Sequence, residues 1–77
     1  MKLRKAVEHA QRFGAAINWV AVDEDKLVYA HITQPTLKNN HWMSAPQRKY
    51  LGVYTGSKNW QTTLRKVPKD PTNMGVV

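Results

Sequence analysis

Residues 50–67, YLGVYTGSKNWQTTLRKV, decide the fold because they predict a β-hairpin at the centre of the chain. The segment 56–59, GSKN, is typical of a turn. With Thr55 paired to Trp60, the alternation of strand side chains divides this hairpin into two faces. The predicted core face holds Leu51, Val53, Trp60, Thr62 and Leu64, and the predicted outer face holds Tyr50, Tyr54, Gln61, Thr63 and Arg65.

A second hairpin is predicted from residues 16–22 and 27–34, which the turn 23–26, DEDK, joins. Pairing Val22 with Leu27 separates an apolar face from a mainly polar one. The predicted core face holds Ile17, Trp19, Ala21, Val28, Ala30 and Ile32, and the outer face holds Asn18, Val20, Tyr29, His31 and Thr33. Each hairpin therefore has one side suited to packing against a helix.

That helix is predicted over Lys2 to Phe13, and Gly14 is a natural end for it. Its apolar stripe consists of Leu3, Ala6, Val7, Ala10 and Phe13. The sequence thus predicts an α+β domain in which one N-terminal helix packs on an antiparallel sheet built from two β-hairpins. Residues 1–67 form this single small domain, and residues 68–77 are predicted to be a flexible C-terminal tail.

Composition limits the classes of function. The chain has 77 residues, a net charge of +7 and no cysteine, which excludes disulfides, thiolate zinc sites and thiol nucleophiles. Residues 26–69 contain eight basic side chains and no acidic one. This charge favours an anionic partner, such as nucleic acid or an acidic protein. The cysteine-free composition fits a cytoplasmic protein, and no segment is apolar and long enough to predict a membrane partner.

The residues that could support catalysis lack the required spacing. His9, His31 and His41 do not form a metal-binding pair, and the acidic turn lacks the glycine and distal glutamate of a calcium loop. We therefore predict no metal, no cofactor, no catalytic residues and no enzymatic activity. A metal-free nuclease that uses His31 and His41 as acid and base is a weaker alternative.

A binding surface is the remaining interpretation. Outward tyrosines on a sheet provide stacking platforms for bases, and nearby cations hold phosphates. The connection 35–48 adds a segment that is predicted either to recognise the partner or to cover the core with Trp42. The predicted binding residues are Tyr29, His31, Lys38, His41, Trp42, Tyr50, Tyr54, Lys58 and Arg65.

The leading functional prediction is non-catalytic binding of single-stranded nucleic acid or RNA, centred on Tyr50, Tyr54 and Arg65. The alternative is a protein-binding module, comparable in size and charge to small phage or mobile-element proteins that redirect a host enzyme. Tyr and Arg are common in protein interfaces as well. The salt dependence of binding distinguishes the nucleic-acid prediction from the protein-binding alternative, because phosphate binding weakens steeply as the salt concentration rises.

Overall fold

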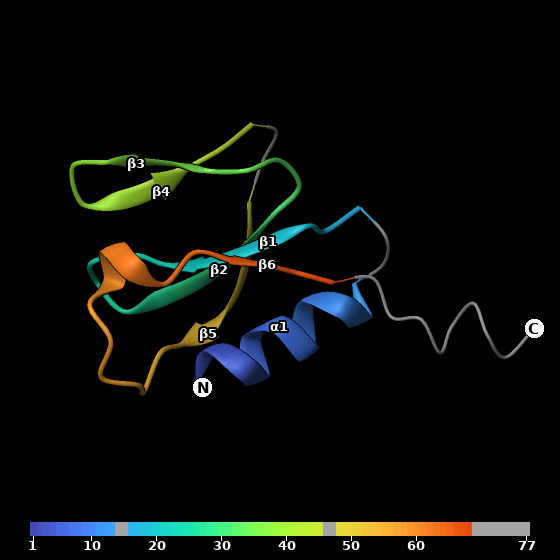
Figure 1. Cartoon of the computed structure of the whole chain (residues 1–77), viewed down its shortest axis with the longest axis horizontal. Helices are drawn as coiled ribbons and strands as arrows, with labels where there is room; N and C mark the ends of the chain where they lie inside the picture. The colour runs from blue at the N-terminus through green and yellow to red at the C-terminus, as the bar shows by residue number, and fades with distance from the viewer. Residues whose placement is uncertain (14–15, 46–47, 69–77) are drawn as a thin grey trace, which may run out of the picture.

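The computed structural model describes residues 1–13, 16–45 and 48–68, and shows one helix packed on an antiparallel sheet (Figure 1). The elements in chain order are α1 (Leu3–Arg12), β1 (Trp19–Val22), β2 (Leu27–His31), β3 (Thr36–Lys38), β4 (His41–Met43), β5 (Lys49–Val53), the 3-10 helix η1 (Trp60–Thr62) and β6 (Arg65–Lys66). Four strands form the main sheet in the order β5-β2-β1-β6, and β3 and β4 form a separate hairpin. The predicted α+β class is confirmed. Gly14 and the predicted tail beyond Pro68 lie outside the described residues.

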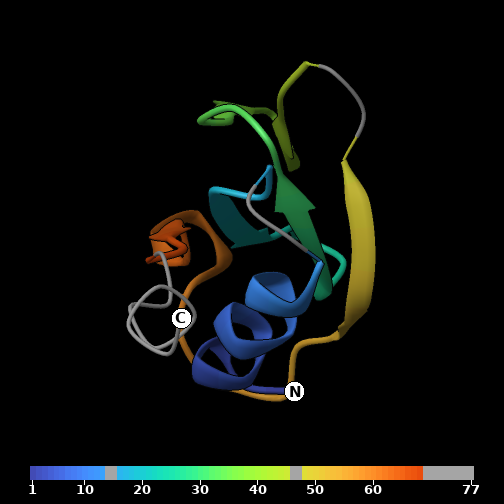
Figure 2. The same cartoon turned by 90° about the vertical axis from the view of Figure 1, so that its right-hand side faces the viewer.

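The layers are α1, the sheet and the β3–β4 hairpin. Figures 1 and 2 show α1 on one side of the sheet and the hairpin on the other. The helix buries Leu3, Ala6 and Ala10, which belong to the predicted apolar stripe. The two alanines are completely buried, and their small side chains allow a close approach to the sheet. Phe13, which was predicted to belong to the same stripe, is 47% exposed.

The first hairpin forms with a register one residue away from the predicted one. Val22 faces Val28 instead of Leu27. The reason lies in the turn, where Lys26 adopts a left-handed backbone conformation with φ 72°. The Lys26 N–H donates to the Asp23 carbonyl, and the Asp23 N–H donates to the Leu27 carbonyl, each at 2.9 Å. Residues 24–26 therefore form a three-residue loop, a common hairpin connection that sequence alternation alone does not distinguish from a four-residue one.

The register shift exchanges the two faces of β1. Val20 and Val22 join Val28 and Ala30 in the core beneath α1. Trp19 was predicted to lie in the core, but it faces His31 across the strands, on the side away from the helix, and is half-buried. The division of β2 into a core face and an outer face was predicted correctly, because the register error affected only its partner strand, β1.

The second predicted hairpin does not form. β5 pairs with β2, and β6 pairs with β1, so β5 and β6 lie at opposite edges of the sheet. The segment after the turn begins with η1, where the Asn59 side chain accepts a hydrogen bond from the Gln61 N–H at 2.9 Å. Thr63, predicted to face outward, is fully buried, and its hydroxyl accepts the Val22 N–H at 2.9 Å. Val53 was predicted to be in the core but is 51% exposed.

The long connection 35–48, in which a short strand over Thr36 to Met43 was considered, contains the two strands of the β3–β4 hairpin. Leu37 faces Trp42, and Lys38 faces His41 across the two strands. Asn39 occupies the turn with φ 24°, a region that asparagine tolerates better than most residues. The Glu24 N–H donates to the Asn40 carbonyl at 3.2 Å, so the turn of this hairpin lies beside the β1–β2 turn.

Candidate functional site

Two of the predicted tyrosines meet on the sheet face opposite α1. Tyr29 of β2 and Tyr50 of β5 are cross-strand partners. Their ring centroids lie 5.8 Å apart with an interplanar angle of 65°, which is an edge-to-face contact. Tyr29 is half-buried, whereas Tyr50 is 52% exposed. The Tyr50 ring therefore remains accessible to a partner while Tyr29 supports its edge.

Arg48 completes this cluster, and the sequence interpretation missed it. Its guanidinium carbon lies 3.8 Å from the Tyr29 ring centroid, in a cation–π contact. The sequence does indicate this position of Arg48, because Arg48 precedes Tyr50 by two residues and alternation places both on the same side of an extended strand. We refer to Tyr29, Arg48 and Tyr50 together as the aromatic face.

Arg48 is held in place by an acidic partner. Its Nη1 donates to Asp23 Oδ2 at 2.6 Å and to the Trp42 carbonyl at 3.3 Å. Asp23 is only 3% exposed, and its Oδ1 accepts the Trp42 N–H at 2.9 Å. The pair thus joins the β1–β2 turn, β4 and the start of β5, and it orients the guanidinium over Tyr29.

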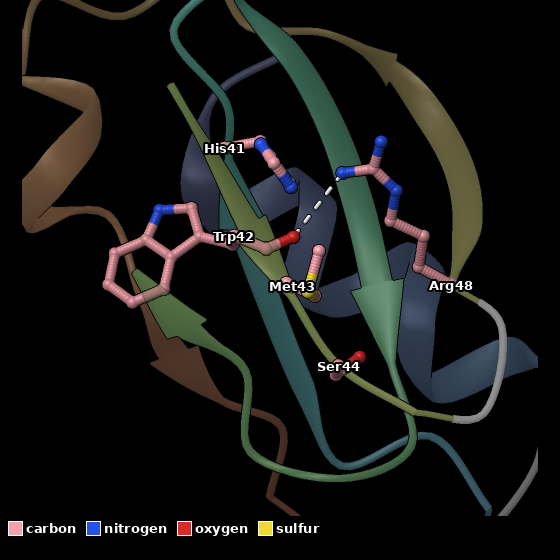
Figure 3. A pocket seen from close by; sticks show the side chains of 5 residues that line it. All are labelled: His41, Trp42, Met43, Ser44 and Arg48. Carbon is pink, nitrogen blue, oxygen red and sulfur yellow. Dashed lines mark hydrogen bonds between the residues drawn. The ribbon is translucent and has the colours of Figure 1, made fainter. Parts of the chain in front are cut away.

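The β3–β4 hairpin forms the opposing wall of an open pocket beside the aromatic face. The pocket has a volume of about 370 Å³ and is lined by His41, Trp42, Met43, Ser44 and Arg48. Figure 3 shows the His41 and Met43 side chains on the side of β4 that faces Arg48, while the Trp42 indole points the other way. Met43 is half-exposed, so this wall offers an apolar surface beside the Arg48 cation.

His31 was predicted to contact the partner, but it is completely buried. Its Nδ1 lies 2.7 Å from the Ser44 hydroxyl oxygen, and its Nε2 has no hydrogen-bond partner among the described residues. Burial, with a further contribution from the Arg48 charge, lowers the pKa of His31 from 6.5 to about 4, although Asp23 acts in the opposite direction. His31 is therefore neutral at pH 7 and is not a phosphate-binding cation.

Tyr54 was also predicted to face outward, and this prediction was wrong. Its ring lies in the core, and the side chain is 6% exposed. Its hydroxyl accepts the Lys58 N–H at 3.2 Å, so the ring packs inside the turn that follows β5. Lys58 is exposed near this turn. Because the Tyr54 ring is buried, Lys58 does not continue a row of outward-facing tyrosines.

Trp42 covers the core-side surface of its hairpin and does not project as a recognition residue. It is buried, and its Nε1 donates to the Trp60 carbonyl at 3.2 Å. Lys38 and His41 are neighbours on the other face of this hairpin, where Lys38 is exposed and His41 half-exposed. These two side chains remain available to a partner.

Arg65 was predicted to lie beside Tyr50, but the two residues are on opposite edge strands. Its Nη1 donates to the carbonyls of Thr62 and Leu64, both at 2.9 Å. Arg65 therefore braces the end of η1. The structure brings Tyr29 and Tyr50 together, keeps Lys38 and His41 on the neighbouring hairpin, and separates Arg65, Tyr54 and Lys58 from them.

Charge is unevenly distributed over the described residues. Three acidic residues, Asp23, Glu24 and Asp25, lie at the β1–β2 turn beside Asn40 and His41, where they line a depression of about 300 Å³. Most exposed cations lie elsewhere, namely Lys2, Arg4, Lys5, Arg12, Lys49, Lys58 and Lys66, whereas Lys26 lies in this turn and Lys38 on the neighbouring hairpin. An anionic partner on the aromatic face is therefore expected to approach from the Lys49 side of β5.

Comparison of the chain with protein-family models gave no match, and neither did searches of curated proteins and solved structures. Within the described residues, no group of three or more His, Asp or Glu side chains is placed to hold a metal ion. No helix of the described chain is long and apolar enough to cross a membrane. The aromatic face and the charges around it are therefore the features of the described chain that bear on its function.

Proposed function

We propose that this protein is a non-catalytic binding domain for single-stranded nucleic acid or RNA, and that the aromatic face is its binding surface. The observation that supports the proposal is the exposed Tyr50 ring, braced by Tyr29 and adjoining the Arg48 guanidinium. Stacking of one base on such a ring is worth about 1–3 kcal/mol and is tolerant of sequence. The cytoplasmic location expected from the composition belongs to the same proposal.

In this arrangement one base stacks on Tyr50, and the flanking phosphates meet cations. Lys49 is exposed and precedes Tyr50, while Lys38 is exposed on the neighbouring hairpin. Arg48 uses Nη1 for its bonds to Asp23 and Trp42, so its guanidinium is already oriented when the partner arrives. Such preorganisation reduces the entropy lost on binding.

The non-catalytic character of the proposal is supported by His31. A nuclease that used His31 and His41 would need both rings beside one phosphate. His31 is fully enclosed and bonded to Ser44, whereas His41 lines the open pocket. A base with a pKa of about 4 is also poorly matched to proton transfer near pH 7.

A protein partner is the second candidate, and the exposed apolar side chains favour it. Tyr50, Met43 and Val53 are each about half-exposed, and β5 is an edge strand. Aromatic and methionine side chains are enriched in protein interfaces. A partner protein would therefore be expected to cover the same aromatic face.

The experiment is fluorescence anisotropy with labelled single-stranded U15 and dT15, titrated with the protein at low and at physiological salt. The proposal expects binding that is tighter than about 100 μM at low salt and weakens steeply as salt rises. Absence of binding to both oligonucleotides at low salt would refute it and would favour the protein partner. Matched double-stranded probes show whether binding requires unpaired bases.

A further inference from the structure

The edge strand β5 carries exposed side chains on both of its sides. Tyr50 lies on the aromatic face, while the preceding Lys49 points toward α1, where its Nζ lies 4.7 Å from the Phe13 ring centroid. Phe13 is 47% exposed although it follows directly after the helix. A second exposed ring with an adjoining cation therefore lies on the helix side of the same strand.

The side of α1 that faces solvent carries further positive charge. Lys2, Arg4, Lys5 and Arg12 are exposed, and Glu8 is the one acidic residue of the helix. Glu8 makes only long ion pairs, at 3.7 Å to Arg4 and 3.6 Å to Lys5. Exposed pairs of this kind are weak, so both cations remain available to a stronger anion. We call Arg4, Lys5, Arg12 and Phe13 the helix face.

The chemistry of the helix face fits phosphates better than a lipid bilayer. A helix that lies on a membrane inserts an apolar stripe between the lipids. In α1 that stripe is already used, because Leu3, Ala6 and Ala10 are buried against the sheet. What remains outside is a row of cations with one ring, which is the composition of a surface that follows a nucleic-acid backbone.

We propose that a single strand bound at the aromatic face crosses the β5 edge at Lys49 and continues along the helix face. Figure 2 shows β5 running along one side of the molecule, from the level of the β3–β4 hairpin to the level of α1. The strand edge thus connects the two faces without an intervening layer. This inference rests on the proposed function and adds to it a binding length and a path.

The path makes affinity depend on oligonucleotide length. A strand of about five nucleotides can occupy the aromatic face alone, whereas one of about fifteen reaches the helix face, a length within the range of known single-strand sites. Joining two contacts on one strand raises affinity without any new type of contact. U5 can sit at about eleven positions on U15, so we expect U15 to bind about a hundredfold or more tightly than U5, well beyond this positional factor.

The test compares U5 and U15 by fluorescence anisotropy, using the full chain and three variants. The double variant Lys5→Gln/Arg12→Gln should reduce the U15 advantage to about the elevenfold that the number of positions gives, and leave U5 binding nearly unchanged. The matched control Lys58→Gln/Lys66→Gln removes the same charge away from the path and should preserve most of the U15 advantage. Glu8→Gln should strengthen U15 binding by removing the competing carboxylate.

The outcomes separate the inference from the proposed function. If neither U5 nor U15 binds, the proposed function itself fails. If both bind but U15 has no advantage beyond the number of positions at which U5 can sit on it, the second face is not used and the inference is overturned. It is also overturned if the two double variants weaken U15 equally, which would indicate only a general effect of charge. Binding of phosphatidylserine vesicles that is lost in Lys5→Gln/Arg12→Gln, without a length effect, would assign the helix face to membranes instead.

Discussion

Asp23 and Arg48 form an ion pair in which Asp23 Oδ2 and Arg48 Nη1 lie 2.6 Å apart, with the carboxylate buried and a third of the arginine side chain exposed. The pair connects the first hairpin turn to the start of β5. Both residues also bond to the backbone of Trp42, through its N–H and its carbonyl. The β3–β4 hairpin is thus attached to the main sheet by a polar contact beside the proposed binding surface.

The first prediction concerns this attachment. Arg48→Met should lower the free energy of unfolding by about 3 kcal/mol, because it leaves a buried carboxylate without its partner. The value lies at the lower end of the range for buried pairs, since Arg48 is partly exposed. Asp23→Asn/Arg48→Met should recover much of that loss, because the buried charge is then absent. Urea denaturation of the variants and wild type measures both changes, and equal losses in the single and double variants would contradict the ion-pair argument.

The second prediction concerns the turn after β5. A Cβ at Gly56 would lie 2.3 Å from the Tyr54 hydroxyl oxygen and 2.4 Å from Cζ of the same ring. Gly56→Ala should therefore lower the free energy of unfolding by about 1–3 kcal/mol through overpacking. In a Tyr54→Leu background the same substitution should cost much less, because the ring that it meets is gone. Thermal unfolding of the four proteins tests this, and an unchanged cost in the Leu background would show that the strain has another origin.

The sequence was sufficient to predict the helix and strands that are defined by a local pattern of residues. The apolar stripe of α1, apart from Phe13, and the strand character of residues 19–22 and 27–31 are visible in the residue spacing, and the structure confirms them. The register of the first hairpin depends instead on the backbone conformation of Lys26, a residue with no strong preference for positive φ. One unpredictable turn residue was enough to exchange Trp19 and Val20 between the two faces.

The candidate site was only partly visible for a similar reason. Tyr29 and Tyr50 were both recognised as outward residues, and alternation within their own strands was enough for that. Which strand lies beside which is a long-range property, and the turn sequence GSKN suggested a local pairing that the chain does not adopt. The assignment of Arg65 to the site depended on that pairing. The outward position of Tyr54 assumed instead that strand alternation continues past Val53, where β5 ends.

The third prediction addresses the binding surface. Tyr50→Ala should weaken binding of U5 by about 1–3 kcal/mol, which is the value of one stacked base, while the fold remains intact because the ring is half-exposed. Val53→Ala on the same strand is a matched control, since Val53 has a similar exposure but carries no ring. Anisotropy titrations and circular dichroism of both variants provide the measurement. Equal weakening by the two substitutions would argue against stacking on Tyr50.

The last prediction is a loss of stability in acid that originates at His31. Because its pKa is about 4 in the folded protein and 6.5 in an unfolded chain, the unfolded state binds the proton more readily between these values. The folded protein therefore has its full stability above pH 6.5, where His31 is neutral in both states, and loses part of that stability as the pH falls toward 4. Each pKa unit corresponds to about 1.4 kcal/mol, so the free energy of unfolding should fall by about 3 kcal/mol over this range.

The acid sensitivity arises because the added proton would be bound at a buried side chain. A protonated His31 would place a positive charge in a fully buried position near Arg48, where, within the part of the chain that the structure describes, the Ser44 hydroxyl is its one hydrogen-bond partner. The replacement His31→Leu should remove this part of the pH dependence, even though it also changes the stability at pH 7. His9→Gln, on the half-exposed part of α1, should retain it. Urea denaturation of the three proteins at several pH values between 4 and 7 measures the slopes, and a His31→Leu slope equal to that of wild type would assign the acid sensitivity to other groups.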